Sequence, residues 1–351
     1  MNDIVSIAKR FDIGEVADVA KYGNGRINET FLVVTHPAPG ERAPYVRYIL
    51  QKLHEIFAPA VLEDIEAVTC RLEAVGLTTP KLVRTLTGEL GVSSGGDCWR
   101  MMTYVPGTTY ESGIDSGLAE KGAALVGKFH NALSGFEYEF RHKIPGFHDT
   151  KAVMSRLKMV ARAFAGTEKH KALYPLAERV LEEYWKLEGS LQLLPDRIIH
   201  GDLKLNNIRF DESGREAVSL LDLDTLGRNK VVIDLGDAVR SWCNRAGEGD
   251  EKNSRFDLGI FEGMMRGYFS TAMFMGREEK EAVPDGVATI ALELTARYIT
   301  DAFEESYFKL DTERFSTLYE QNRANAAAQL CFYDDFQAAR EDVARIIERY
   351  F

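Results

Sequence analysis

The pattern of apolar and polar residues changes character about a third of the way along the chain. Segments 29–35 and 45–53 alternate or run continuously in apolar residues and are bracketed by Gly, Pro and Asn, which is typical of β-strands. Between residues 61 and 75 the apolar positions recur at helical spacing. Segments 81–86 and 98–104 also have strand character, so the pattern predicts a small sheet accompanied by a helix.

From residue 116 onward helical periodicity dominates, most clearly in segments 119–133, 173–191 and 257–271. A Pro-Gly turn at residues 106 and 107 separates these helices from the strands. The sequence therefore predicts an α+β protein with a smaller β-rich lobe, residues 1–104, and a larger helical lobe, residues 105–351.

Composition limits the partners of this chain. Its 351 residues include 54 acidic and 43 basic ones, for a net charge of −11, whereas a nucleic-acid or anionic-membrane surface requires a basic footprint. No apolar run has the length of a membrane span, and the N-terminus lacks a basic region followed by an apolar core. We expect a cytoplasmic protein that acts on a small molecule and binds neither nucleic acid nor membrane.

Cysteine usage points away from metal or redox chemistry. The four cysteines are scattered and form no C-x-x-C pair. Buried thiols are therefore expected, and a zinc site or disulfide framework is not.

Candidate chemistry is concentrated between residues 198 and 210. His200, Asp202 and Asn207 have the spacing H-x-D-x-x-x-x-N, in which the Asp and Asn are as far apart as in the catalytic loop of kinases. A lone H-x-D is more often a turn or a helix cap. Phosphoryl transfer, however, needs a carboxylate at the acceptor hydroxyl and oxygen ligands for Mg²⁺, and the compound pattern supplies both.

A second acid follows this loop. Two apolar segments, 208–210 and 218–223, flank a turn at residues 211–214 and predict a β-hairpin. We expect the hairpin to place Asn207 and Asp222 near its two ends, where both could reach one metal ion.

A glycine turn, defined here as residues 23–28, lies between two predicted strands. It contains Gly23, Asn24, Gly25, Arg26 and Asn28. Glycine permits the backbone conformations in which successive N–H groups surround an anion, so the turn is a candidate phosphate site. Such turns are also frequently structural, and the assignment depends on the kinase-like loop downstream.

The strand that should supply a phosphate-orienting lysine has Gln51 at the inward position. Lys52, one residue later, would face the opposite side of an ideal strand. The sequence leaves three candidates: Gln51 itself, Arg47, or a bulge that redirects Lys52. Glu66 on the following helix could be the partner of such a cation, or an ordinary exposed residue.

Two acids and two arginines lie in apolar surroundings further along. Asp234 or Asp237 could cap the following helix and brace the 200–207 loop through backbone N–H groups. Arg240 and Arg297 need partners if buried, so each could pair internally or face a polar substrate.

These motifs resemble the superfamily of aminoglycoside phosphotransferases and choline kinases, and within it the bacterial N-acetylhexosamine 1-kinase branch. The superfamily pattern H-x-D-x-x-x-x-N followed by I-D-x-[DE] is matched at His200, Asp202, Asn207, Asp222 and Asp224, with Leu221 in place of Ile. Finer similarity lies in segments 23–28, 47–51, 147–150, 204–208, 221–225 and 234–237 and at Arg297, so it covers most of the chain.

The resemblance implies a bilobal protein-kinase-like fold that uses ATP and Mg²⁺. It assigns Asp202 as catalytic base, and Asn207 and Asp222 as Mg²⁺ ligands. Nucleotide would bind under the glycine turn, near Gln51 and against a hinge at Met102 and Tyr104. The wider superfamily has a lysine where this chain has Gln51. The resemblance implies that the sugar-kinase branch also has Gln at this position.

The acceptor implied by the resemblance is the anomeric hydroxyl of an N-acetylhexosamine. A neutral sugar needs directional hydrogen bonds, for which Asp202, Arg240, Arg297 and Tyr307 are the candidates. The competing hypotheses are an aminoglycoside, a choline-like amine or homoserine as acceptor, or a kinase-like nucleotide sensor without activity. A monomer or weak homodimer is expected.

Overall fold

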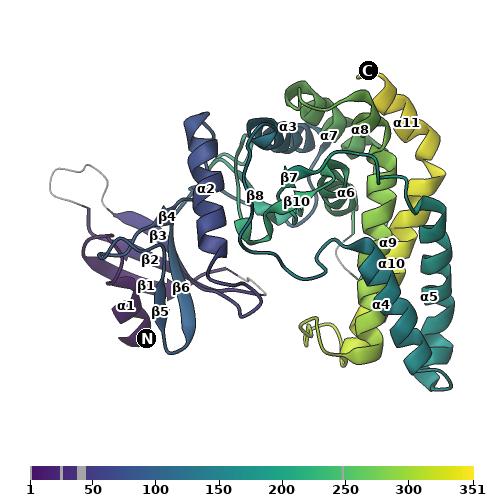
Figure 1. The fold of residues 1–351 in the computed structure, drawn as a ribbon, viewed down its shortest axis with the longest axis horizontal. Coiled ribbons are helices and arrows are strands. Elements are labelled where there is room, and N and C mark those ends of the chain that lie inside the picture. The colour runs from purple at the N-terminus through teal and green to yellow at the C-terminus, as the bar shows by residue number, and fades with distance from the viewer. Residues whose placement is uncertain (1, 24–26, 38–44, 247–248) are drawn as a thin grey trace. The chain divides into compact units, whose positions relative to one another are not determined.

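The computed structural model describes residues 2–23, 27–37, 45–246 and 249–351. Contacts between residues divide the chain into two compact units (Figure 1). The first comprises residues 1–107 with two later segments, Gly135–Ile144 and Ser219–Leu226. The second comprises residues 108–134, 145–218 and 227–351. The inclusion of the two later segments in the first unit is a feature that the sequence pattern did not predict.

A six-stranded antiparallel sheet forms the centre of the first unit. Its strands are ordered β1-β2-β3-β6-β4, and β5 pairs with β6. The elements of this unit are α1 (Asn2–Ala8), β1 (Val16–Lys21), β2 (Glu29–Thr35), β3 (Val46–Lys52), α2 (Val61–Ala74), β4 (Leu82–Val83), β5 (Val92–Ser94) and β6 (Asp97–Thr103).

The strands and the helix of this unit follow local sequence signals. Val33, Leu50 and Met101, one from each of β2, β3 and β6, are fully buried in the core. Gly95 and Gly96 join β5 to β6 with φ angles of 63° and 89°, the left-handed conformation that a tight hairpin turn requires. Strand 29–35 and helix 61–75 were predicted well; α1 and β5 were not predicted, and β1 was expected only as a strand of unspecified bounds before the glycine turn.

The segment Gly135–Ile144 is attached to α2 by one buried carboxylate. Asp64 accepts hydrogen bonds from the Tyr138 hydroxyl at 2.8 Å and from the backbone N–H groups of Arg141 and His142 at 2.9 and 2.8 Å. Three donors satisfy the charge of a residue that is only 2% exposed. The pattern of apolar residues gives no sign of this attachment.

Helices dominate the second unit. They are α3 (Ser116–Leu133), α4 (Thr150–Ala163), α5 (Glu168–Leu187), α6 (Val231–Trp242), α7 (Leu258–Thr271), α8 (Arg277–Glu281), α9 (Val283–Glu304), α10 (Leu318–Ala338) and α11 (Arg340–Glu348). Helix α9 is buried along most of its length because α4, α5, α6 and α10 pack around it (Figure 1). It therefore forms the core of this unit.

Helices α3 and α7 pack at very short range because glycine lies at their contact. A Cβ at Gly267 would be 1.9 Å from the Glu120 carbonyl oxygen, and one at Gly263 would be 2.3 Å from the Ser116 carbonyl oxygen. Backbone meets backbone here, so no larger residue fits without separating the helices.

Short strands connect these helices. They are β7 (Arg197–Ile199), which pairs with β10 (Gly227–Asn229), and β8 (Ile208–Phe210), which pairs with β9 (Ala217–Leu220). The β8-β9 pair is the predicted hairpin, with Asp211 accepting hydrogen bonds from Ser213 and Arg215 in its turn. Within the described ranges no helix is both long and apolar enough to cross a membrane.

Candidate functional site

The 200–207 loop follows buried strand β7 and ends in the 3₁₀ helix η1 (Leu205–Asn207). The Asn207 amide nitrogen donates to the Asp202 carbonyl oxygen at 2.8 Å and to the Asp202 carboxylate at 3.2 Å. Lys204 Nζ lies 2.6 Å from the same carboxylate oxygen. The second unit thus joins Asp202 and Asn207 by hydrogen bonds and adds Lys204, to which the sequence pattern gave no role.

Helix α6 holds the backbone of this loop through a buried carboxylate. Asp234 is 1% exposed and accepts the N–H groups of His200 and Gly201 at 2.7 and 2.8 Å, while its Oδ2 also contacts His130 Nε2 at 3.0 Å. Burial alone would raise the pKa of Asp234, but the hydrogen bond and charge of His130 and the His200 contacts outweigh it and lower that pKa. The carboxylate therefore remains ionised.

The predicted bracing role of Asp234 is confirmed, but helix capping is wrong for both acids. Asp234 and Asp237 lie inside α6, whose N-cap is Lys230 and has no side-chain cap. Two further residues of α6 also hold the loop. Ser241 Oγ accepts the Leu205 N–H at 3.0 Å, and Trp242 Nε1 donates to the Leu203 carbonyl at 2.8 Å.

A second support comes from His148, which contacts the carbonyl oxygen of Gly201, whereas Asp234 accepts the Gly201 N–H. His148 Nε2 lies 2.8 Å from the Gly201 carbonyl oxygen, and Nδ1 lies 3.0 Å from Glu293 Oε1. Thr150 Oγ1 donates to the other oxygen of Glu293 at 2.5 Å. Segment 147–150 belonged to the sequence resemblance, but nothing in its pattern indicated a contact with the 200–207 loop.

The two arginines predicted near the acceptor are found in different settings. Arg240 is buried and binds Asp237 through Nε and Nη2, at 3.0 and 2.7 Å, so internal pairing is observed. Arg297 is half-buried, and its Nη2 donates to the exposed Tyr307 hydroxyl at 2.9 Å. Arg297 lies one helical turn after Glu293 on α9. Burial alone would raise the pKa of the Glu293 carboxyl, but the contacts with His148 and Thr150 lower it, and the charge of Arg297 adds a smaller lowering.

In the first unit, a buried polar network surrounds Gln51. Arg100 on β6, 1% exposed, donates to Gln51 Oε1 from Nε and Nη2 at 2.9 and 2.7 Å. It also binds both carboxylate oxygens of buried Asp224. Gln51 Nε2 donates to Thr30 Oγ1 at 3.1 Å, and Asn28 Nδ2 donates to Asp224 Oδ2 at 2.6 Å. Asn28, Gln51 and Asp224 are therefore brought together around a cation that the sequence pattern did not predict.

Lys52 and Glu66 form separate ion pairs elsewhere in this unit. Strand β3 keeps regular register with β2, so no bulge redirects Lys52, which pairs with Glu29 and Asp97 at 3.4 and 3.3 Å. Glu66 pairs with Arg84 at 2.6 Å. An arginine within the apolar run 99–102 was the available signal for Arg100, because a buried Arg requires an acidic partner.

The predicted hinge residues also lie in this unit. Met102 is buried on β6, opposite Ile49. The Arg47 guanidinium lies over the Tyr104 ring, with its Cζ 4.3 Å from the ring centroid. The Tyr104 ring also meets the Tyr22 ring edge-on, with 6.3 Å between the two centroids.

Tyr22 leads into the glycine turn, where Gly23 has a φ of 70°. Asn24, Gly25 and Arg26 lie outside the described residues, so their predicted contact with phosphate stays a prediction.

Asp222 has a backbone conformation that non-glycine residues seldom adopt. Its φ and ψ are 61° and 63°, and its side chain is exposed. Left-handed backbone costs about 1–2 kcal/mol for most residues, less for Asp, and such strain concentrates at functional sites. A strained, exposed acid immediately after the hairpin is consistent with the metal role that the sequence resemblance implied.

Asn207 and Asp222 offer the donors that Mg²⁺ prefers. The Asn207 amide nitrogen donates to Asp202, so its oxygen is the atom that could ligate a metal, and Asp222 offers a carboxylate. No cluster of three or more His, Cys, Asp or Glu that could hold a metal occurs among the described residues. Mg²⁺ in phosphotransfer sites typically uses one or two protein side chains together with water and substrate phosphates. Each of the two residues therefore offers a donor atom that fits Mg²⁺.

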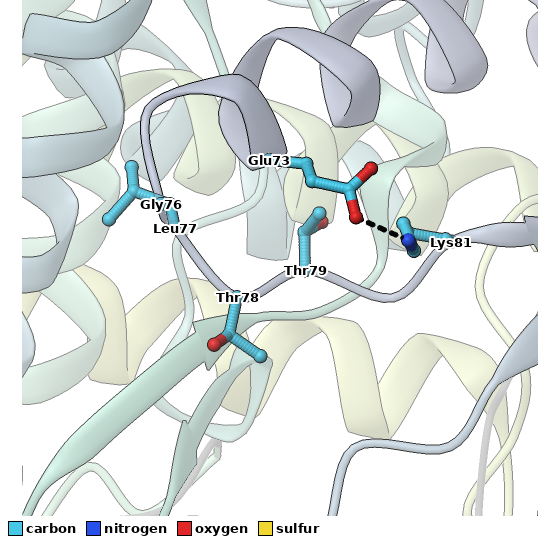
Figure 2. A pocket seen from close by; sticks show the side chains of 6 residues that line it. All are labelled: Glu73, Gly76, Leu77, Thr78, Thr79 and Lys81. Atoms are coloured by element: carbon cyan, nitrogen blue, oxygen red, sulfur yellow. Dashed lines mark hydrogen bonds and ion pairs between the residues drawn. The ribbon is translucent and has the colours of Figure 1, made fainter.

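A surface hollow of about 320 Å³ lies in the first unit, at the end of α2 and the loop that follows (Figure 2). Glu73 and Lys81 face each other across it and form an ion pair of 2.5 Å. None of the predicted site residues lines this hollow.

Comparison with known proteins bears on the family and the fold of this chain. The model of the family described as phosphotransferase enzyme family (APH) matches residues 18–266. An aminoglycoside phosphotransferase from Alicyclobacillus acidocaldarius is 15% identical, with 97% of this chain and 96% of that chain covered and a TM-score of 0.65. Amicoumacin kinase hAmiN, in complex with AMP-PNP, Ca²⁺ and Ami, is 14% identical over 97% of this chain and 93% of its own, with a TM-score of 0.62.

Choline kinase from Cryptosporidium parvum is similar to the same degree, with 14% identity, 99% and 97% coverage and a TM-score of 0.60. At such identities the structures demonstrate the fold, which is kinase-like, with a small antiparallel sheet and a larger helical region, as predicted. The match to the family model covers more than half of the chain. The chain therefore belongs to the phosphotransferase enzyme family.

Proposed function

We propose that this protein transfers the γ-phosphate of ATP to the anomeric hydroxyl of an N-acetylhexosamine, giving the sugar 1-phosphate. The observation that supports transfer most strongly is the 200–207 loop, where Asp202 is held by Asn207 and Lys204 on a doubly braced backbone. Fixed placement of a carboxylate beside the acceptor supplies most of what phosphoryl transfer requires.

In this proposal Asp202 accepts a hydrogen bond from the anomeric hydroxyl and takes its proton. A bond forms between the anomeric oxygen and the γ-phosphorus as the bond from that phosphorus to the β,γ-bridging oxygen breaks, releasing ADP. Lys204 places a cation beside Asp202, where it could offset negative charge on the transferring phosphoryl group. Mg²⁺, for which Asn207 and Asp222 are each a candidate ligand, would neutralise charge on the nucleotide phosphates.

Charge near the loop supports a neutral acceptor over a cationic one. His148, Arg240 and Arg297 contribute positive charge in the second unit; Glu293 is paired through both of its oxygens, whereas Asp237 is paired through Oδ1 alone. A polycationic aminoglycoside would need several available carboxylates, and these two acids offer one unpaired oxygen between them. Arg297 and Tyr307 can instead supply directional hydrogen bonds to hydroxyl or acetamido groups.

An ADP-release assay across acceptor classes tests the proposal. We expect turnover with N-acetylglucosamine or N-acetylgalactosamine and none with their 1-O-methyl glycosides, because the methyl group blocks the reacting hydroxyl. Glucosamine, choline, homoserine and an aminoglycoside are the competing acceptors. Activity confined to one of these would replace the acceptor while keeping the reaction. Nucleotide binding without turnover of any acceptor would favour a nucleotide sensor.

A further inference from the structure

The peptide group before Asp202 is held at both ends. Its carbonyl oxygen, on Gly201, contacts His148 Nε2 at 2.8 Å, and its N–H, on Asp202, points to His200 Nδ1 at 3.3 Å. Gly201 has a φ of 84°, so the chain turns sharply at this point in a conformation that favours glycine. The orientation of this peptide group sets the direction of the Asp202 side chain, and any rotation would move the carboxylate.

His148 is held in an unusual state for a histidine. Its two ring nitrogens both face acceptors, the Glu293 carboxylate and the Gly201 carbonyl, and a neutral imidazole has only one N–H to donate. Because the pKa of Glu293 is lowered and its carboxyl is ionised, both hydrogen bonds exist together only if the ring is the imidazolium. The side chain is 7% exposed and its backbone φ is 50°, so the surrounding structure imposes a strained conformation on a buried cation.

The charges around this imidazolium explain why it is tolerated. Glu293 on α9 is 1% exposed and pairs with it directly, Asp237 on α6 adds negative charge, and Arg297 acts mainly on Glu293. Burial alone would lower the pKa of His148, but the hydrogen bond and charge of Glu293 and the Gly201 contact outweigh it and raise that pKa to about 9. The ring is thus charged at neutral pH.

We propose that His148 is a positioning residue for the reaction. As an imidazolium paired with Glu293, it donates a hydrogen bond to the Gly201 carbonyl and so orients Asp202 toward the acceptor hydroxyl. The proposal rests on the function proposed above, since it requires Asp202 to be the base. Loss of the ring proton removes one of the two hydrogen bonds and releases the peptide group. In this proposal His148 acts through the Gly201 peptide group and Asp202.

The test combines kinetics with a readout that does not require turnover. His148→Gln and Glu293→Gln are compared with the wild type for kcat, KM and pH dependence, using the best acceptor found. His170→Gln, a substitution of a histidine stacked on Tyr174 in α5, is the matched control. Nuclear magnetic resonance of imidazole nitrogens follows the protonation of His148 in wild type and Glu293→Gln.

We expect His148→Gln to lower kcat at pH 7.5 by about tenfold or more, with KM for ATP nearly unchanged, and to abolish a fall in kcat above pH 9. Glu293→Gln should move that fall toward neutral pH, and His170→Gln should behave as the wild type. In the resonance spectra, His148 should keep both ring protons at pH 8, and lose one near neutral pH in Glu293→Gln.

Two results would overturn the proposal. One is an unchanged kcat and unchanged alkaline fall in both variants while the wild type is active, which would leave the proposed function intact. The other is a His148 ring that is neutral at pH 8. If the wild type turns over no acceptor, the proposed function fails, and the resonance titration alone still decides whether His148 is held as the imidazolium.

Discussion

At the scale of single residues, Arg100 is the most consequential side chain of the first unit. Strands β2, β3 and β6 place Thr30, Gln51 and Arg100 opposite one another, so the three side chains form one cross-strand row. The row ends at Asp224, two residues after the proposed metal ligand Asp222. This unit therefore has a buried cation although it lacks the usual strand lysine. The cation is Arg100 on the neighbouring strand β6, and it holds the Asp224 segment.

This arrangement predicts a large stability effect. Arg100→Met leaves the Asp224 carboxylate buried without its cation, and we expect the free energy of unfolding to fall by about 3–5 kcal/mol. The control is Lys52→Met on β3, where the partly exposed ion pairs are worth about 1 kcal/mol or less. Urea denaturation measures both. Equal losses for the two variants would contradict the importance of the buried network.

At the scale of elements, the glycine contact between α3 and α7 makes a specific prediction. Gly267→Ala places a methyl group 1.9 Å from the Glu120 carbonyl oxygen, so the helices must separate. We expect a loss of about 1–3 kcal/mol in the free energy of unfolding. Gly135→Ala, where nothing lies within 4 Å of the added Cβ, should change it little. Thermal unfolding followed by circular dichroism compares the two.

The segment that begins at Asp222 makes a second prediction at this scale. Asp222→Asn keeps a residue that tolerates left-handed backbone, whereas Asp222→Val does not and should lose about 1–2 kcal/mol of stability. Both should raise the Mg²⁺ concentration for half-maximal activity by about tenfold or more, because a charged ligand is lost. Wild-type Mg²⁺ dependence in Asp222→Asn would remove Asp222 from the metal site.

Elements were predictable from the sequence wherever periodicity was strong. Strand β2, helix α2 and the β8-β9 hairpin agree with their apolar pattern and turn residues. The bounds of strand β1 were not predicted because its side chains are exposed or half-buried, so it lacks an apolar stripe. The bracing of the 200–207 loop was predictable for Asp234 but not for His148, because His148 reaches Gly201 across 53 residues of intervening chain.

At the scale of the whole molecule, His148 couples stability to pH. Its pKa rises from 6.5 in the unfolded chain to about 9 in the folded protein. The stabilisation is therefore complete below pH 6.5 and is lost as pH rises through 9, with a size of about 3 kcal/mol. The difference in unfolding free energy between wild type and His148→Gln should shrink over this range. A difference that stays constant from pH 6 to pH 9.5 would contradict it.

Glu293 and Asp234 contribute to the dependence of stability on pH in the acid range. Both have lowered pKa values, because the contacts of each with histidine outweigh its burial. Their contribution to stability is present above the ordinary carboxyl range and is lost as pH falls through the lowered values. The 200–207 loop is thus braced by two buried carboxylates, one acting directly and one through His148.

The most direct test of the account is the identity of the product. Wild-type protein is incubated with ATP, Mg²⁺ and N-acetylglucosamine, and the product is examined by phosphorus nuclear magnetic resonance. We predict a phosphorus signal coupled to the anomeric proton, and a rate lower by about 10³-fold in Asp202→Asn with nucleotide binding retained. Phosphorus coupled to the C6 protons, or full activity in Asp202→Asn, would contradict the account.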